Sequence, residues 1–384
     1  MANTITDLIP DIYAALDVVS REQVGFIPSV SMDATFERAA VGQTVRSPVA
    51  PAASATDITP GVTPPDDGDQ TIGNVNMTIT KARRVPVRWN GEQERGLNNG
   101  GPGANTIMQD QFAQAMRTLC NEVEADLAAL HIYASRAYGT AGTAPFGTAG
   151  DMTDASNALK ILKDNGAPLT GNQLVIDTTA GASFLGKQSK VNEQGTDRMM
   201  RQGIILQTMG LDIRESAQVV TAAAGTGASA TTNNAGYAVG ATVITLASAG
   251  TGAILAGDVI TFAGDTNKYV VASGDADVSG GGTITLAAPG LRKAIAASAT
   301  NITVIAASAR NMVFARSAIA LATRAPALPS RGDMAADRQL VTDPRSGLTF
   351  EIAMYPQYRQ MQYEVSLAWG VKAVKAEHIG LLLG

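Results

Sequence analysis

Cysteine and histidine are scarce in this chain of 384 residues, and this scarcity excludes several kinds of chemistry. The single cysteine, Cys120, cannot form a disulfide within the chain, and we interpret it as a small buried apolar residue. The two histidines, His131 and His378, stand in no H-E-x-x-H pattern, and C-x-x-C is absent. Zinc sites, thiol chemistry and a Ser-His-Asp triad therefore lack candidates. The sequence predicts a protein that is not an enzyme and that has no cofactor, catalytic residue or metal site.

Charged residues are also few, at 16% of the chain, and they sum to a net charge of -5. This balance argues against a dedicated nucleic-acid binder, which would show a basic surplus. A surface so poor in charge tends to associate, so we expect much of it to be buried against other protein. No apolar run reaches the length of a membrane span, and the N-terminus lacks a basic-then-apolar signal pattern. We expect folding in a reducing cytoplasm, without a membrane.

The nearest approach to a catalytic motif runs from Gly181 to Gln188 and matches G-x-x-x-x-G-K after a predicted strand. Gln188 stands where the hydroxyl that holds magnesium is needed, and Phe184 and Leu185 are bulky where backbone amides must surround phosphate. We therefore interpret the segment as structural. A P-loop-like NTPase remains an alternative function.

The stretch from Asn105 to Tyr138 predicts one long amphipathic helix. Its large apolar residues recur at steps of three and four, which places them on one face. Polar residues that include Asp110, Glu124 and Ser135 are expected on the opposite, solvated face. The apolar face comprises Phe112, Met116, Leu119, Val123, Leu127 and Leu130.

Residues 1–20 predict a short amphipathic helix that must dock on its own body or on a neighbour, because it cannot be stable alone. Its outer face is acidic and suits a basic partner, such as a scaffolding protein, although a merely solvated face is an open alternative. The acidic residues are Asp7, Asp11 and Asp17.

Residues 41–100 predict an extended arm. Residues 45–65 are rich in Pro, Ala and Thr, and residues 75–89 alternate apolar and polar, so the two stretches predict a long hairpin. A compact domain rarely needs such an arm, and we expect it to reach another subunit. Its tip is acidic and its returning strand basic, and we expect these charges to make intersubunit contacts. The open alternative is that they keep an exposed strand soluble and prevent unwanted edge pairing. They are Asp66, Asp67 and Asp69 at the tip, and Lys81, Arg83, Arg84 and Arg88 on the strand.

The sequence after the long helix predicts an α/β layer that is interrupted by an inserted β-domain. Helices are expected after Thr153 and from Ala180, with strands near 174–177, 204–206 and 211–213. Between residues 221 and 309 the chain turns to Ala, Gly, Thr and Val, with short, evenly spaced strands that predict a small antiparallel barrel or sandwich. Strands near 311–314, 349–354, 363–369 and 371–374 follow, and the last three are expected to form a sheet beside the long helix.

This order of parts resembles the major capsid protein of tailed bacteriophages, which has the Johnson fold. Val75 to Trp89 looks like the returning strand of the family's E-loop, and Asn105 to Tyr138 like its spine helix. Asn311 to Ala322 is similar to a strand and helix of the axial domain, and Tyr363 to Lys372 to the family's last strands. The inserted segment makes the chain most similar to the coat proteins of short-tailed phages of the Salmonella type.

The resemblance implies an α+β fold with a particular division of the chain. The parts are an N-terminal arm (1–40), the E-loop (41–100), a peripheral domain with spine helix (101–150), an axial domain (151–220 and 310–340), the inserted β-barrel (221–309) and C-terminal peripheral strands (341–384).

The implied function is self-assembly into the icosahedral shell around a double-stranded DNA genome. Implied partners are copies of the chain itself in hexamers and pentamers, a separate scaffolding protein, a portal protein at one vertex and packaged DNA bound without sequence specificity. Assembly is expected in the host bacterial cytoplasm, and the product is the virion capsid. A phage tail or surface-layer structural protein is the other alternative.

Overall fold

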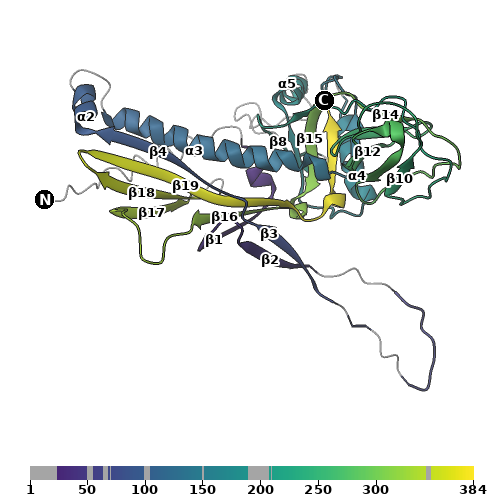
Figure 1. The fold of residues 1–384 in the computed structure, drawn as a ribbon, viewed down its shortest axis with the longest axis horizontal. Coiled ribbons are helices and arrows are strands. Elements are labelled where there is room, and N and C mark those ends of the chain that lie inside the picture. The colour runs from purple at the N-terminus through teal and green to yellow at the C-terminus, as the bar shows by residue number, and fades with distance from the viewer. Residues whose placement is uncertain are drawn as a thin grey trace.

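The computed structural model describes residues 24–49, 55–63, 68–69, 71–98, 104–148, 151–188, 207–208, 210–342 and 347–384. Within these ranges the chain is mostly strands with a few helices, which confirms the expected α+β class. Figure 1 shows an elongated body in which the long helix α3 runs beside one sheet and ends at a second group of strands. A hairpin leaves the body on the side away from α3.

The long helix is shorter than the sequence predicts. α3 spans Ala104–Ala128 and continues as a 3-10 turn, η2 (Ala129–Tyr133). The predicted apolar stripe is confirmed, because Phe112, Met116 and the other members of that face are buried. Residues 136–138 are not helical. They belong to strand β5 (Arg136–Gly139), which pairs with strands from two remote parts of the chain.

The first sheet lies against α3. Its strand order is β1-β16-β19-β18-β17, and β4 pairs with the opposite edge of β19. The C-terminal strands predicted beside the long helix are thereby confirmed. The members are β1 (Ser31–Ala39), β4 (Lys81–Asn90), β16 (Ile319–Pro326), β17 (Asp337–Thr342), β18 (Thr349–Gln357) and β19 (Gln360–Ala373), and helix α2 (Gly91–Asn98) follows β4.

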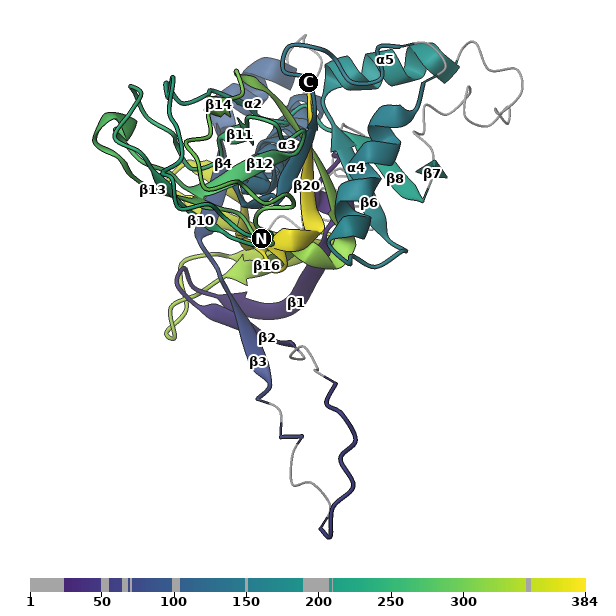
Figure 2. The same cartoon turned by 90° about the vertical axis from the view of Figure 1, so that its right-hand side faces the viewer.

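The second sheet has β15 near its centre, flanked by β20 and β6 (Figure 2). Of the strand and helix expected over 311–322, the strand is confirmed and the helix is wrong. After β15 the chain makes a short 3-10 turn, η4 (Arg316–Ala318), and enters β16, because β16 finds partners in both β1 and β19. The elements of this region are α4 (Thr153–Asp164), β6 (Asn172–Ile176), α5 (Thr178–Gln188), β7 (Gln207–Thr208), β8 (Leu211–Glu215), β9 (Thr221–Ala222), β15 (Ser308–Ala315), η5 (Ala376–His378) and β20 (Ile379–Leu383).

Residues 221–309 contribute a further set of short strands with a buried apolar cluster of its own, which includes Ile244, Phe262 and Ile284. Several predicted strand positions are confirmed, and β10 coincides with the expected 243–246. The set continues the second sheet, because β12 pairs with β5. The strands are β10 (Val243–Leu246), β11 (Val259–Phe262), β12 (Lys268–Ser273), β13 (Gly282–Leu286) and β14 (Ile302–Val304), with the turn η3 (Val278–Gly280).

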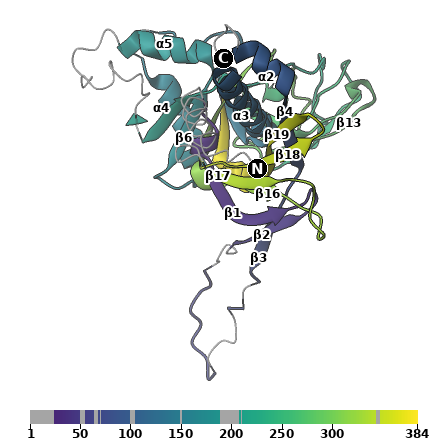
Figure 3. The same ribbon diagram turned by 90° about the vertical axis from the view of Figure 1, so that its left-hand side faces the viewer.

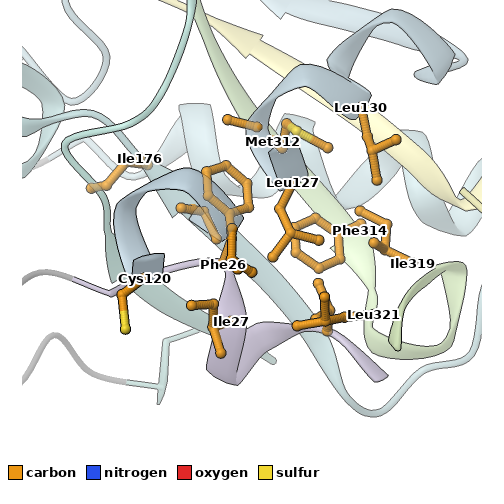
Figure 4. Close-up of a cluster of buried hydrophobic side chains, with 14 of the residues drawn as sticks. Phe26, Ile27, Cys120, Leu127, Leu130, Ile176, Met312, Phe314, Ile319 and Leu321 are labelled. Carbon is orange, nitrogen blue, oxygen red and sulfur yellow. The ribbon is translucent and has the colours of Figure 1, made fainter. Parts of the chain in front are cut away.

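The main core joins α3 to both sheets and to the segment that precedes β1. Phe26 stacks on Phe314 of β15, with ring centroids 6.4 Å apart. Figure 4 shows Phe26 and Ile27 in one apolar cluster with Leu127 of α3, Phe314 of β15 and Leu321 of β16. Burying a side chain of this size contributes roughly 1.5–3 kcal/mol, so this short N-terminal segment is a substantial part of the core.

Candidate assembly surface

The arm is a two-stranded hairpin that stands out from the body (Figures 1 and 3). β2 (Thr44–Val49) pairs antiparallel with β3 (Gly73–Thr78), from Thr44 opposite Thr78 to Val49 opposite Gly73. Neither strand pairs with another strand in the described part of the chain. An isolated two-stranded hairpin is marginally stable in water, so this one needs support from elsewhere.

Beyond the paired strands, the described arm residues expose large apolar side chains. Ile58 is 97% exposed, Val62 is 106% exposed and Ile72 is 66% exposed. Ile58 and Val62 lie four residues apart in a stretch without regular secondary structure. Exposed apolar side chains on a projecting segment are available for contact with another molecule.

The base of the arm is seated closely on β19. A small apolar cluster joins Met77 and Ile79 to Ala322 and Ala368 of the sheet. The Thr80 amide donates to the Trp369 carbonyl at 3.0 Å, and Lys372 Nζ donates to the Asn76 carbonyl at 2.7 Å. The arm therefore leaves the body at a fixed place.

A glycine makes this seat possible. A Cβ at position 370 would lie 2.9 Å from the carbonyl carbon of Thr78 and nearer still to its oxygen. Real Cβ atoms essentially never approach closer than 3.0 Å. Gly370 thus allows the backbone of the hairpin to cross directly over β19.

The four cations expected on the arm lie on the body instead. The segment from Val75 to Trp89 is not one strand. β3 ends at Thr78, and β4 pairs along its whole length with β19. The predicted position of Lys81, Arg83, Arg84 and Arg88 on the arm is wrong, because β19 offers β4 a complete ladder of backbone hydrogen bonds.

Three of these cations have acidic partners within the body. Lys81 Nζ lies 2.6 Å from Asp126 of α3, and Arg83 Nε lies 3.5 Å from Glu122 of the same helix. Arg84 Nη1 lies 2.7 Å from Glu364 of β19. Arg83 and Arg84 remain more than half exposed, so these ion pairs leave room for a further acidic partner.

Arg88 lines an open groove of about 430 Å³ at the α2 end of the sheet, with Trp89, Gln93, Gly96 and Gln111. The indole of Trp89 donates to Gln111 at 2.7 Å. In the described part of the chain β4 pairs with β19 alone, so its outer edge is open. Pro86 and the cations on this edge strand limit indiscriminate pairing.

The acidic residues assigned to contacts are mostly beyond what the structure describes. Asp66 and Asp67 lie outside the described residues, as do the N-terminal Asp7, Asp11 and Asp17. Asp69 is described and exposed. The contacts expected of these residues therefore remain predictions.

The candidate phosphate loop is a helix. α5 begins at Thr178, two residues after β6 ends, so Gly181 already lies in its first turn and donates to the Asp177 carbonyl at 2.9 Å. Backbone amides committed to helical hydrogen bonds cannot surround a phosphate. This geometry argues against the NTPase alternative.

Two residues that were expected on the solvated face are buried. Glu124 of α3 and Ser135, which lies beyond the end of the helix, are each 1% exposed. Glu124 accepts hydrogen bonds from the backbone of Phe26 and Ile27 and from the Ser216 hydroxyl. Burial raises the pKa of Glu124, and these donors oppose that rise. The local sequence gives no signal of this site, because the covering segment lies about a hundred residues away.

A second buried group of charges lies where α3 ends. Arg310 of β15 is 1% exposed, and His131 of η2 is nearby. Burial lowers the pKa of His131, and the positive charge of Arg310 lowers it further. No described residues form a group of His, Cys, Asp or Glu suited to a metal ion. No described helix is long and apolar enough to cross a membrane.

Comparison with known proteins finds similar shapes among solved structures, whereas no family model and no curated protein matches the sequence. The capsid structure of the cyanophage P-SCSP1u aligns with 12% identity and a TM-score of 0.47, covering 92% of this chain and 86% of that one. The mature capsid of bacteriophage PhiM1 aligns with 11% identity and a TM-score of 0.46, covering 94% and 86%.

A virus-like particle from Pyrococcus furiosus aligns with 11% identity and a TM-score of 0.45, covering 98% of this chain and all of that one. Each of these TM-scores is below 0.5.

Proposed function

We propose that this chain is a major capsid protein that assembles into an icosahedral shell around the double-stranded DNA of a tailed bacteriophage. The observation that carries the proposal is the arm. It projects from the body, exposes Ile58 and Val62 almost completely, and is seated on β19 through a close backbone contact. A rigidly seated arm with an uncovered apolar surface suits a contact that every copy repeats.

The arm suggests that copies of the chain assemble into closed rings. An arm that leaves one copy and lands elsewhere on the next makes a heterologous contact, and such contacts close into rings when the rotation permits. Hexamers and pentamers of the chain are the rings from which an icosahedral shell is built.

Charge complementarity suggests where the arm lands. The arm tip carries Asp66, Asp67 and Asp69, and the outer edge of β4 carries Arg83, Arg84 and Arg88. Because these cations lie on the body, the proposal assigns them to the copy that receives the arm. We propose that the acidic tip of one subunit lies along the basic β4 edge of its neighbour, with Lys81 behind it. Complementary charge fixes register even where each pair is weak.

The remaining partners follow from the proposed role. A scaffolding protein would bind the acidic N-terminal residues, a portal protein would occupy one vertex, and packaged DNA would contact the inner surface without sequence specificity. Replacing Asp7, Asp11 and Asp17 together by lysine should reduce shell assembly and leave folding intact. Shells of normal yield and size from this triple variant would contradict a role for these acids. Assembly would take place in the host cytoplasm and end in the virion capsid.

Electron microscopy of the purified, expressed chain tests the proposal, with a basic scaffolding partner supplied where the chain alone stays unassembled. Closed shells are the expected product. Tubes, fibres or flat lattices would contradict it and favour a tail or surface-layer protein. A strictly monomeric product that binds nucleotide would contradict it and favour an NTPase.

A paired variant tests the arm. Ile58→Asp with Val62→Asp should abolish shells while the far-ultraviolet spectrum and melting temperature stay at wild-type values, because both side chains are already in water in the single chain. Leu169→Asp is the control, since Leu169 is 77% exposed and lies on the body between α4 and β6. Equal loss of shells in the control would contradict a specific role for the arm.

A further inference from the structure

We propose that residues 24–39 form a strap that closes on the body as one unit, and that Glu124 is the positioning residue that locks it. The strap comprises the segment with η1 (Ile27–Ser29) and strand β1. Its η1 turn contacts α3, and β1 contacts η4 and runs along β16 as an outer strand of the first sheet (Figure 3).

The strap is held by partners far away in the sequence. β1 pairs in parallel with β16, from Ser31 opposite Ala320 to Ala39 opposite Pro326. Arg316 donates to the Val30 carbonyl at 3.3 Å, and Arg324 donates to the Asp33 carbonyl at 2.6 Å and to its carboxylate at 3.0 Å. These partners lie about 290 positions away, so closing the strap on them requires a long loop of chain to close, which is costly in entropy.

Glu124 provides the lock at the start of the strap. Its Oε1 accepts from the Ile27 amide at 2.7 Å, and its Oε2 accepts from the Phe26 amide at 3.0 Å. The Ser216 hydroxyl donates to Oε2 at 2.8 Å. Two consecutive amides at the start of η1 therefore point at one buried carboxylate, which is the arrangement that binds anions at helix starts.

A carboxylate at position 124 is compatible with both the closed and the open state of the strap. With the strap closed, Glu124 is buried, and its charge is balanced by the three donors rather than by a cation. With the strap open, the same side chain lies on the polar face of α3 and is hydrated. A leucine at position 124 would stabilise only the closed state. Burying the charge of Glu124 costs free energy, and this cost offsets part of the stabilisation that burial of Phe26 and Ile27 provides.

Closure of the strap also sets the base of the arm. β1 ends at Ala39, and β2 of the arm begins at Thr44. Ala39 itself belongs to the apolar cluster that holds Met77 and Ile79 against the sheet. An open strap would therefore leave the arm without part of its seat. This consequence for assembly rests on the proposed function, whereas the lock itself does not.

Hydrogen exchange measured by mass spectrometry on the unassembled full chain tests the lock. Glu124→Gln keeps the shape of the side chain but replaces one acceptor oxygen by an amide that cannot accept. We expect exchange in residues 24–34 to accelerate by about 10-fold to 100-fold, because a hydrogen bond to a charged group is lost. Exchange in β15 and β20 should stay unchanged. Asp110→Asn is the matched control, since it makes the same charge change on an exposed site of α3.

A second variant keeps Glu124 and blocks closure by contact. A Cβ at position 25 would lie 2.7 Å from the Glu215 carbonyl oxygen. Gly25→Ala should therefore produce the same pattern of faster exchange. It keeps the test available if the Glu124→Gln variant does not fold.

Two results would overturn the inference. One is wild-type exchange over residues 24–34 in both variants, and the other is equal acceleration across strap and core, which would make the strap an inseparable part of the core. Neither measurement involves shells. Failure of the lock is thus distinguishable from failure of the capsid proposal, which electron microscopy decides.

Discussion

Replacing Gly370 by alanine should move the arm without disturbing the helix side of the sheet. The added Cβ would stand 2.9 Å from the Thr78 carbonyl carbon and 3.1 Å from the Ile79 Cα. Ordinary carbon contacts lie at about 3.5–4.0 Å, so the hairpin must retreat by about 1 Å. Such overpacking costs roughly 1–3 kcal/mol, which sets an upper range for the loss of stability.

The retreat has a local signature. It weakens the bonds at the base of the arm, from Thr80 to the Trp369 carbonyl and from Lys372 to the Asn76 carbonyl. The indole of Trp369 donates to Asp126 of α3 at 2.8 Å, and this contact lies on the helix side of the sheet. Tryptophan fluorescence should therefore stay unchanged while the arm shifts.

The assay combines thermal unfolding, fluorescence and electron microscopy of assembled product. We expect a melting temperature lowered by a few degrees, unchanged emission, and shells that are fewer or irregular, because the displaced arm no longer meets its neighbour in register. Gly280→Ala is the control, since nothing lies within 4 Å of the added Cβ in η3. Wild-type stability together with wild-type shells would refute the close seating of the hairpin on β19.

Three further predictions address other parts of the chain. Arg83→Glu with Arg84→Glu should reduce shell yield but shift the melting temperature little, since each exposed ion pair contributes only about 0.2–1 kcal/mol; early melting of the monomer would contradict a role in contacts. The isolated segment 221–309 should fold as a β-domain, and a far-ultraviolet spectrum of random coil would disprove this. Burial lowers the pKa of His131 below its ordinary value of 6.5, so the unfolded chain takes up a proton at this histidine at a higher pH than the folded chain does. The free energy of unfolding should therefore fall as the pH drops below about 6.5. Thermal melts of His131→Gln should show a weaker pH dependence, and a pH dependence identical to that of the wild type would be evidence against this role of His131.

The sequence by itself determined the elements whose signal is local. The stripe from Phe112 to Leu127 identifies α3, because a helix that packs one face must repeat apolar residues every three to four positions. Alternation and turn residues likewise located β10 at 243–246. These patterns require only that one face be buried, whatever covers it.

The tertiary structure alone decided what covers each face and where each ladder ends. Arg83 and Arg84 belong to the body because β19, which lies about 280 positions away, pairs with β4. Residues 136–139 form a strand because β20 and β12 are available beside them. Glu124 is buried because a segment from near the N-terminus brings two amides to it. Such pairings depend on partners remote in the chain, and local periodicity carries no information about which partner arrives.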